Sequence, residues 1–300
     1  MAHTHHHHHA PTSYNRAFAI GIGLNLVFVA VEFIYGVVGN SLALITDAGH
    51  NLSDVLTLLL AWGAIYLAGK EPTPYRTYGF RRLTILASLL SGMLLLVAVG
   101  AIAWEALGRF TDPQPVDGMT VIVVAAIGVV INTITALLFI RGQKHDLNIK
   151  AAFLHMAADA GVSLGVVIAG VVILFTGWLW VDPLLGLLIA LVILYSTLDL
   201  LRDSTGLAID AVPKGIDPHE VEVYLKQLPG VTEVHDLHIW PMSTTETALT
   251  AHLVIPQFPG DDSLVQQASE ELHHRFGIEH VTLQCETGND DCKQASPGSL

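Results

Sequence analysis

Charged residues are scarce in this chain of 300 residues, since only 14% are Asp, Glu, Lys or Arg while 52% are hydrophobic. A soluble globular domain carries about 25% charged residues. The shortage is also uneven, because nearly all the long apolar runs lie between residues 14 and 203. The composition therefore disfavours a single soluble domain and predicts a membrane domain followed by a soluble one.

Cysteine is nearly absent, and basic residues are few beyond the apolar part. The two cysteines, Cys285 and Cys292, do not suggest a disulfide framework, so we expect a free or metal-binding pair in a reducing compartment. From residue 204 to the end, the chain has 15 acidic and 4 basic residues, a net charge of −11. Nucleic acid requires a basic surface. We therefore expect no nucleic-acid partner, and an acidic surface that suits cations.

Three sequence signals are missing. The first ten residues have no apolar stretch, so we expect no cleavable signal peptide. No G-x-x-x-x-G-K-[ST] motif occurs, and nothing therefore indicates ATP-driven transport. The His-Glu-x-x-His pattern of zinc metalloproteases is also absent, which argues against an enzyme.

The apolar part contains six stretches long enough to span a bilayer. The positive-inside rule predicts their orientation, because one side carries nine basic residues and the other only Arg109. Both termini are then cytoplasmic, and we expect a multi-pass protein of the bacterial inner membrane. The six predicted spans are 16–38, 42–68, 83–108, 117–140, 152–176 and 182–201. The nine basic residues are Arg16, Lys70, Arg76, Arg81, Arg82, Arg141, Lys144, Lys150 and Arg202.

The acidic part alternates between helical and β-branched patterns. Helices are predicted at 216–228 and 262–276, and strands at 231–240, 247–255 and 280–286. The predicted fold is an α-helical membrane protein with six transmembrane helices and a small cytoplasmic α+β (αββαβ) C-terminal domain. The expected divisions are a His-rich arm at 1–13, a membrane domain at 14–203, a regulatory domain at 204–287 and a tail at 288–300.

Two His/Asp pairs lie inside these apolar stretches, a hundred residues apart. His50 and Asp54 are spaced i, i+4, and so are His155 and Asp159, which puts each pair on one helix face. Ionisable side chains at membrane depth cost roughly 2.5–3.5 kcal/mol each on insertion scales, so they persist there mainly for function. Two nitrogens and two carboxylates form a ligand set suited to tetrahedral Zn²⁺.

Other polar residues have a structural as well as a functional interpretation. We interpret Asp47 as a helix-capping or supporting residue rather than a ligand. Glu32, Asn25 and Asn132 are expected to hydrogen-bond between helices, with a polar path or proton relay as the alternative. Glu105 and Arg109 have the spacing of an ion pair within one helix, at its outer end.

Histidines outside the spans form two groups. His3 and His5 to His9 are either an expression tag or, as we prefer, a native chelating arm. On the predicted strands, His235 and His252 could share one sheet face, and Glu286 lies on the last strand. Surface histidines are the alternative. His238 lies on the first of these strands, and His273, His274 and His280 are expected to be mostly solvated.

Together, five segments resemble the cation diffusion facilitator family over almost the whole chain. They are SLALITDAGHNLSD, TYGFRR, AAFLHMAADAGVS, VHDLHIW and LTAHLVI. The resemblance implies that His50, Asp54, His155 and Asp159 are the transport ligands of a zinc-type member. It also implies metal ligands at His235, His252 and Glu286, with Gln284 where some members have a ligating histidine. A charge link between Arg82 and Asp210 is implied as well.

The resemblance further implies a homodimer in the lipid bilayer that exchanges cytoplasmic metal for protons by alternating access. We therefore expect a proton-coupled exporter of Zn²⁺, with Cd²⁺ or Co²⁺ as other candidate substrates, and no enzyme. A membrane-bound zinc sensor and an intramembrane metalloenzyme are the alternatives.

Overall fold

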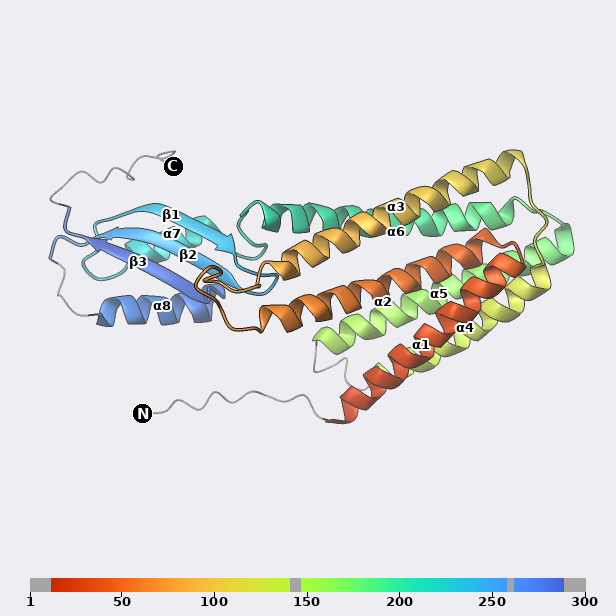
Figure 1. Ribbon diagram of the computed structural model, residues 1–300, viewed down its shortest axis with the longest axis horizontal. Helices are drawn as coiled ribbons and strands as arrows, with labels where there is room; N and C mark the ends of the chain where they lie inside the picture. The colour runs from red at the N-terminus through yellow and green to blue at the C-terminus, as the bar shows by residue number, and fades with distance from the viewer. Residues whose placement is uncertain (1–11, 141–146, 258–261, 289–300) are drawn as a thin grey trace. The chain divides into compact units, whose positions relative to one another are not determined.

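The computed structural model describes residues 12–140, 147–257 and 262–288. Within the helices, further side chains lie outside the description, among them those at 12–22 and 147–152 and those of Asn25 and Asp54. Six long helices come first along the chain (Figure 1): α1 (Thr12–Val38), α2 (Leu42–Ala68), α3 (Leu83–Thr111), α4 (Gly118–Phe139), α5 (Leu147–Thr176) and α6 (Val181–Ala208).

Length and apolar composition make four stretches of these helices long enough to cross a membrane, judged on the described residues. They are Leu83–Thr111, Gly118–Leu138, Phe153–Thr176 and Val181–Ala208. The described part of α1 adds a shorter apolar stretch, Leu26–Val38. The six helices match the six predicted spans to within a few residues, except that α5 begins five residues before its predicted span and α6 ends seven residues after its own.

The chain divides into two compact units, and the first contains most of the membrane helices: Met1–Leu58 with Met93–Leu198. Its core contains buried residues from several of these helices, such as Phe28 of α1, Leu44 of α2 and Val166 of α5. Glycine lets α4 and α5 approach closely, because a Cβ on Gly118 would lie 3.1 Å from the carbonyl oxygen of Gly170. Small residues at such positions are typical of helix packing in membranes, where no hydrophobic effect drives helices together.

The second unit comprises Leu59–Gly92 and Asp199–Leu300. Within it, the start of α3 lies against the end of α6: Ser88 and Ser204 share a hydrogen bond of 2.7 Å between their hydroxyls. The predicted charge link is confirmed, because the Arg82 guanidinium donates to the Asp210 carboxylate at 2.6 Å. Arg81 similarly pairs with Glu246 at 2.7 Å.

The rest of this unit is the α+β domain. Its elements are α7 (Pro218–Lys226), β1 (Glu233–Pro241), β2 (Thr247–Val254), α8 (Ser263–Phe276) and β3 (His280–Glu286). The strand order is β1-β2-β3, with β1 antiparallel and β3 parallel to β2. The predicted αββαβ order is therefore confirmed, with boundaries shifted by no more than about two residues.

Helices α7 and α8 contribute Val221 and Leu272 to one core with the sheet residues Leu249 and Leu253. Asp217 caps α7, since its carboxylate accepts a hydrogen bond from the backbone N–H of His219. Gly277 ends α8 in the left-handed conformation, at φ 67°, which glycine adopts without steric cost.

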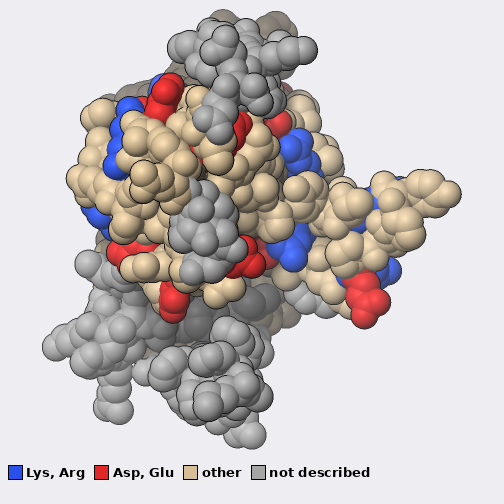
Figure 2. Space-filling model, turned by 90° about the vertical axis from the view of Figure 1, so that its left-hand side faces the viewer, with Lys and Arg blue, Asp and Glu red and all other residues tan. Residues whose placement is uncertain are grey.

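Charges of both signs are interspersed on the face of the molecule drawn in Figure 2. Lys226 pairs with Glu222 along α7, and this hydrogen bond lowers the pKa of the Glu222 carboxyl. Lys214 donates to Asp203 at 2.6 Å, which raises the pKa of the lysine. Both lysines are thus paired locally with a carboxylate, and the net charge of −11 for residues 204–300, which already counts them, is unchanged.

Candidate metal sites

Helices α2 and α5 bring two imidazoles to one carboxylate. His50 Nε2 on α2 lies 3.9 Å from Asp159 Oδ1, and His155 Nε2 lies 3.7 Å from Asp159 Oδ2. The two imidazole rings are edge-on, with centroids 6.2 Å apart. Three of the four predicted ligands therefore lie together, from two helices separated by about a hundred residues.

The three side chains differ in their access to the surroundings. Asp159 is buried, whereas the side chains of His50 and His155 are 22% and 44% exposed. The carboxylate thus lies at the inner side of the group and the imidazoles at its more open side. The backbone of Asp54 is one helical turn beyond His50 on α2, but its side chain lies outside the described residues.

The first turn of α2 is tied to α3 and α6 through Asp182. Its carboxylate accepts hydrogen bonds from the Ser41 hydroxyl, at 2.5 Å, and from the backbone N–H of Leu42, at 2.6 Å. Arg109 Nη1 lies 3.8 Å from the same carboxylate. A carboxylate at a helix N-terminus satisfies otherwise unpaired donors and complements the helix dipole. This contact anchors the start of α2 two turns before His50.

Arg109 contacts two further residues besides Asp182. It donates to the Asn40 carbonyl oxygen at 2.7 Å and to the Asn40 side-chain oxygen at 3.1 Å. It also pairs with Glu105 at 3.0 Å, as the i, i+4 spacing predicted. Asp182 has no signal in the sequence, because its partners lie some 70 and 140 positions away along the chain.

Glu32 and Asn132 are both fully buried. The predicted hydrogen bond between helices is wrong for Asn132, whose amide has no partner among the described residues. Glu32 of α1 instead lies within hydrogen-bonding reach of Asp47 and Asn51 of α2. Asp47 accepts a hydrogen bond from the Ser163 hydroxyl of α5 at 3.2 Å. It lies in the interior of α2 and does not cap it, which leaves only the supporting part of its predicted role.

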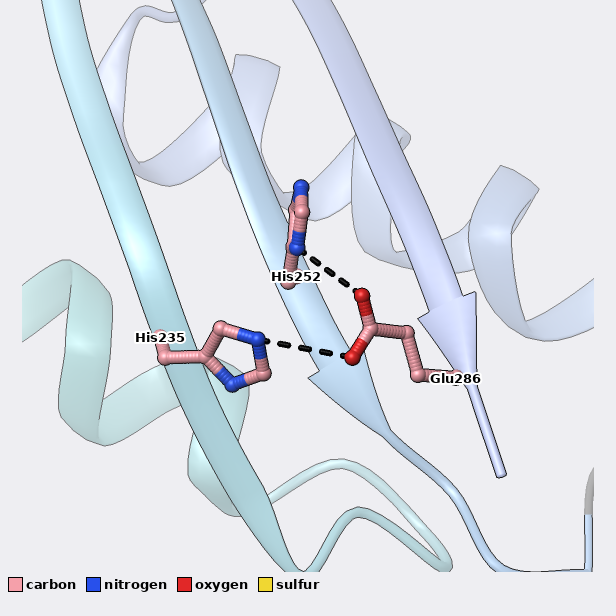
Figure 3. A group of neighbouring side chains, drawn as sticks. All are labelled: His235, His252 and Glu286. Carbon is pink, nitrogen blue, oxygen red and sulfur yellow. Dashed lines mark ion pairs between the residues drawn. The ribbon is translucent and has the colours of Figure 1, made fainter. Parts of the chain in front are cut away.

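A second group of donors lies on the sheet face opposite the helices. His235 on β1 pairs in register with His252 on β2, and their ring centroids are 5.2 Å apart. Glu286 at the end of β3 lies 3.4 Å from His235 Nε2 and 2.9 Å from His252 Nδ1 (Figure 3). One ligand atom of each residue lies within 4.8 Å of the others, which suits a single metal ion.

Asp236 also belongs to this group, although the sequence analysis did not single it out. The pairing of β1 with β2 slips by one residue between His235 and His238, a β-bulge in which Asp236 has φ 50°. Its carboxylate lies 3.0 Å from His238 Nε2 and 3.5 Å from His252 Nε2. Residue alternation places neighbours on opposite faces, so only the bulge could bring Asp236 beside His235.

The remaining predictions have mixed outcomes. His273, His274 and His280 are exposed, as expected. Gln284 donates to Glu286 at 2.8 Å and so supports the carboxylate. Cys285 contacts the hydrophobic core, where burial raises the pKa of its thiol, and it does not face the histidines. Cys292 and the N-terminal histidines lie outside the described residues.

Comparison with known proteins covers nearly the whole chain. Residues 18–207 match the family described as the cation efflux transmembrane domain, and residues 213–288 match the cation efflux protein cytoplasmic domain. The zinc transporter ZitB of Escherichia coli (strain K12) is 36% identical over 290 residues, covering 95% of this chain and 92% of ZitB.

Two further relatives have similar coverage. The metal cation efflux system protein CzcD of Cupriavidus metallidurans is 35% identical over 294 residues, which is 98% of this chain and 92% of CzcD. The cadmium, cobalt and zinc/H(+)-K(+) antiporter of Bacillus subtilis (strain 168) is 34% identical over 265 residues, covering 87% of this chain and 85% of that protein.

Proposed function

Because this chain belongs to the cation efflux family, a family of multi-pass membrane transporters, we propose that it exports Zn²⁺ from the cytoplasm in exchange for protons. The observation that carries the proposal is the convergence of His50 and His155 on the buried carboxylate of Asp159. Asp54, one turn from His50 on the same helix, is proposed as the fourth ligand.

The chemistry of this ligand set favours a borderline-soft divalent ion. Imidazole nitrogen and carboxylate oxygen in a tetrahedral set suit Zn²⁺, with Cd²⁺ and Co²⁺ as further candidate substrates. Four protein ligands leave no position for a reactive water, so the set favours transport over hydrolysis. The names of ZitB, CzcD and the Bacillus subtilis antiporter, which mention zinc, cadmium and cobalt between them, support this choice.

Exchange for protons follows from the same ligands. Imidazoles and carboxylates bind metal only when deprotonated, so metal binding displaces protons and protons displace metal. Imidazole titrates near ambient pH, which lets a modest change in proton concentration favour release. In the proposed cycle the metal enters from the cytoplasmic side, the helices change their tilt, and protons displace the metal on the other side.

We also propose that the cytoplasmic domain is a regulatory metal site in a homodimer. His235, His252 and Glu286 would hold a divalent ion there, and the two His235 ring nitrogens have no hydrogen-bond partner among the described residues. Asp236 would keep the His252 ring in place through Nε2, leaving Nδ1 for the metal. Bound cations would also offset the repulsion between two acidic domains.

A spin-label distance across the dimer tests the regulatory site. Zinc should shorten this distance in the wild type, and combined His235→Ala and His252→Ala substitutions should remove the response. The Asp236→Asn variant should need about 10–100-fold more zinc, because it loses the carboxylate that orients His252.

The matched control is Glu233→Gln, the same carboxylate-to-amide change at an exposed position of β1. It should respond to zinc like the wild type. An Asp236→Asn variant with an unchanged zinc midpoint would show that Asp236 does not orient the ligand.

The competing functions differ in what the purified protein does. Zinc-dependent proton flux across reconstituted liposomes is expected of an antiporter and absent for a sensor. Hydrolysis of a peptide by the purified protein would instead support the alternative of an intramembrane metalloenzyme. We further propose an inner-membrane location. The nine-to-one asymmetry of basic residues supports an orientation with both termini in the cytoplasm. The proposed domain limits are 1–13 for the arm, 14–203 for the membrane domain, 204–287 for the regulatory domain and 288–300 for the tail.

A further inference from the structure

Two carboxylates that the metal site does not use are buried side by side in the membrane helices. Glu32 of α1 is 0% exposed and Asp47 of α2 is 1% exposed. The two groups lie within hydrogen-bonding reach of each other. Ionised carboxylates only accept hydrogen bonds, so two of them cannot bond to each other unless a proton lies between them.

Little positive charge faces the pair among the described residues. No lysine or arginine there is among the groups that act on it, and the one basic group that does is His50, which acts on Asp47. Both oxygens of Glu32 and Oδ1 of Asp47 lack a hydrogen-bond partner among the described residues. Asn51, one turn along α2 and 1% exposed, lies beside Glu32 with its amide likewise without a partner there. Such groups are costly in a membrane unless they are hydrogen-bonded or, for a carboxylate, paired with a charge or protonated.

The walls of this group are close-packed. Ser163 of α5 donates to Asp47 Oδ2. A Cβ on Gly128 of α4 would lie 2.6 Å from the Phe28 ring and 3.0 Å from the Ser163 hydroxyl. Helix α4 has no titratable residue in its sequence and so offers the pair no counter-charge.

The pair is electrostatically linked to the proposed metal ligands without being one of them. Asp159 of α5 acts on both carboxylates, and His50 of α2 acts on Asp47. Among the described residues, these are the titratable groups outside the pair whose charge acts on it. A divalent cation held by His50 and Asp159 would therefore favour the fully ionised form of the pair.

We propose that Glu32 and Asp47 form a second proton-binding site, which holds one proton between the two carboxylates and releases it when metal binds nearby. The proposal rests on the proposed export function and names a place for one of the exchanged protons. In the metal-free protein, the proton bridges Glu32 and Asp47 Oδ1. When the metal arrives, the proton leaves to solvent and both carboxylates are ionised, and the proton returns after the metal departs.

Counting the protons released on zinc binding tests this site. The purified full-length protein in detergent is titrated with Zn²⁺ in weakly buffered solution containing a pH indicator. The Glu32→Gln variant should release about one proton fewer per protomer than the wild type while binding the same number of zinc ions. Asp47→Asn should have the same effect, because either amide removes one member of the pair.

Glu71→Gln is the matched control, since it makes the same change at an exposed position. It should release as many protons as the wild type. A Glu32→Gln variant with the wild-type proton count would overturn the proposal. Loss of zinc stoichiometry in this variant would also overturn it, because Glu32 would then serve the metal site directly.

The Asp159→Ala variant separates this inference from the proposed function. It should lose the zinc ion of the membrane site together with the protons released there, which leaves the contribution of the cytoplasmic domain. Unchanged zinc binding by Asp159→Ala would contradict the membrane metal site. An unchanged proton count in Glu32→Gln would contradict only the second proton site.

Discussion

Zinc uptake into inverted membrane vesicles should fall to background in the Asp159→Ala variant. The Asp159 carboxylate lies within 4 Å of both intramembrane imidazoles, and it is buried. Without it, the metal would lose an anionic ligand in a place where water compensates poorly for a missing charge. The measurement is the initial rate of zinc accumulation under an imposed pH gradient, at equal protein level.

The control for this prediction is Asp199→Ala. Asp199 is an aspartate of α6 whose side chain is 67% exposed, so its removal should leave zinc uptake near the wild-type rate. If Asp159→Ala transported zinc at a near-normal rate, the proposed ligand assignment would be untenable.

The second large effect is expected at Asp182, on the stability of the protein. This carboxylate is 1% exposed, accepts hydrogen bonds from the start of α2 and faces Arg109, whose side chain is 9% exposed. Breaking a buried ion pair by removing one partner costs about 3–5 kcal/mol, because the other charge is left buried. Asp182→Ala should therefore lower the melting temperature by roughly 10 °C.

Thermal unfolding in detergent, followed by size-exclusion chromatography, measures this loss. Asp199→Ala again serves as the control, with little expected change. The melting temperature of Asp182→Asn should lie between those of Asp182→Ala and Asp199→Ala, since an amide still accepts hydrogen bonds but carries no charge. A melting temperature of Asp182→Ala within about 1 °C of the wild type would show that the contact with Arg109 contributes little.

The structural features that depend on local sequence pattern could be predicted from the sequence. Apolar run length gave the six helices, and β-branched alternation gave the αββαβ order. The i, i+4 spacing placed His155 and Asp159 on one face, and Glu105 beside Arg109. The charge link from Arg82 to Asp210 came from the family resemblance, since these residues are 128 positions apart.

What could not be predicted depends on backbone irregularity or on three-dimensional packing. Asp236 reaches the sheet histidines only because of a bulge, and a single-residue slip leaves no clear sequence signal. Asp182 meets the start of α2 only after the helices have packed. The position of Glu32 in a predicted span suggested a hydrogen bond to another helix. Helix packing placed the Glu32 carboxyl against a second carboxylate, that of Asp47, which the sequence does not reveal.

The central claim is that two histidines and two aspartates within the membrane hold the exported ion. X-ray absorption spectroscopy tests it on zinc-loaded protein that carries His235→Ala and His252→Ala, so that the cytoplasmic site does not contribute. The zinc ion should have four nitrogen or oxygen ligands at about 2.0–2.2 Å, two of them imidazoles. A sulfur ligand at about 2.3 Å, or a spectrum with a single imidazole, would contradict the proposed site.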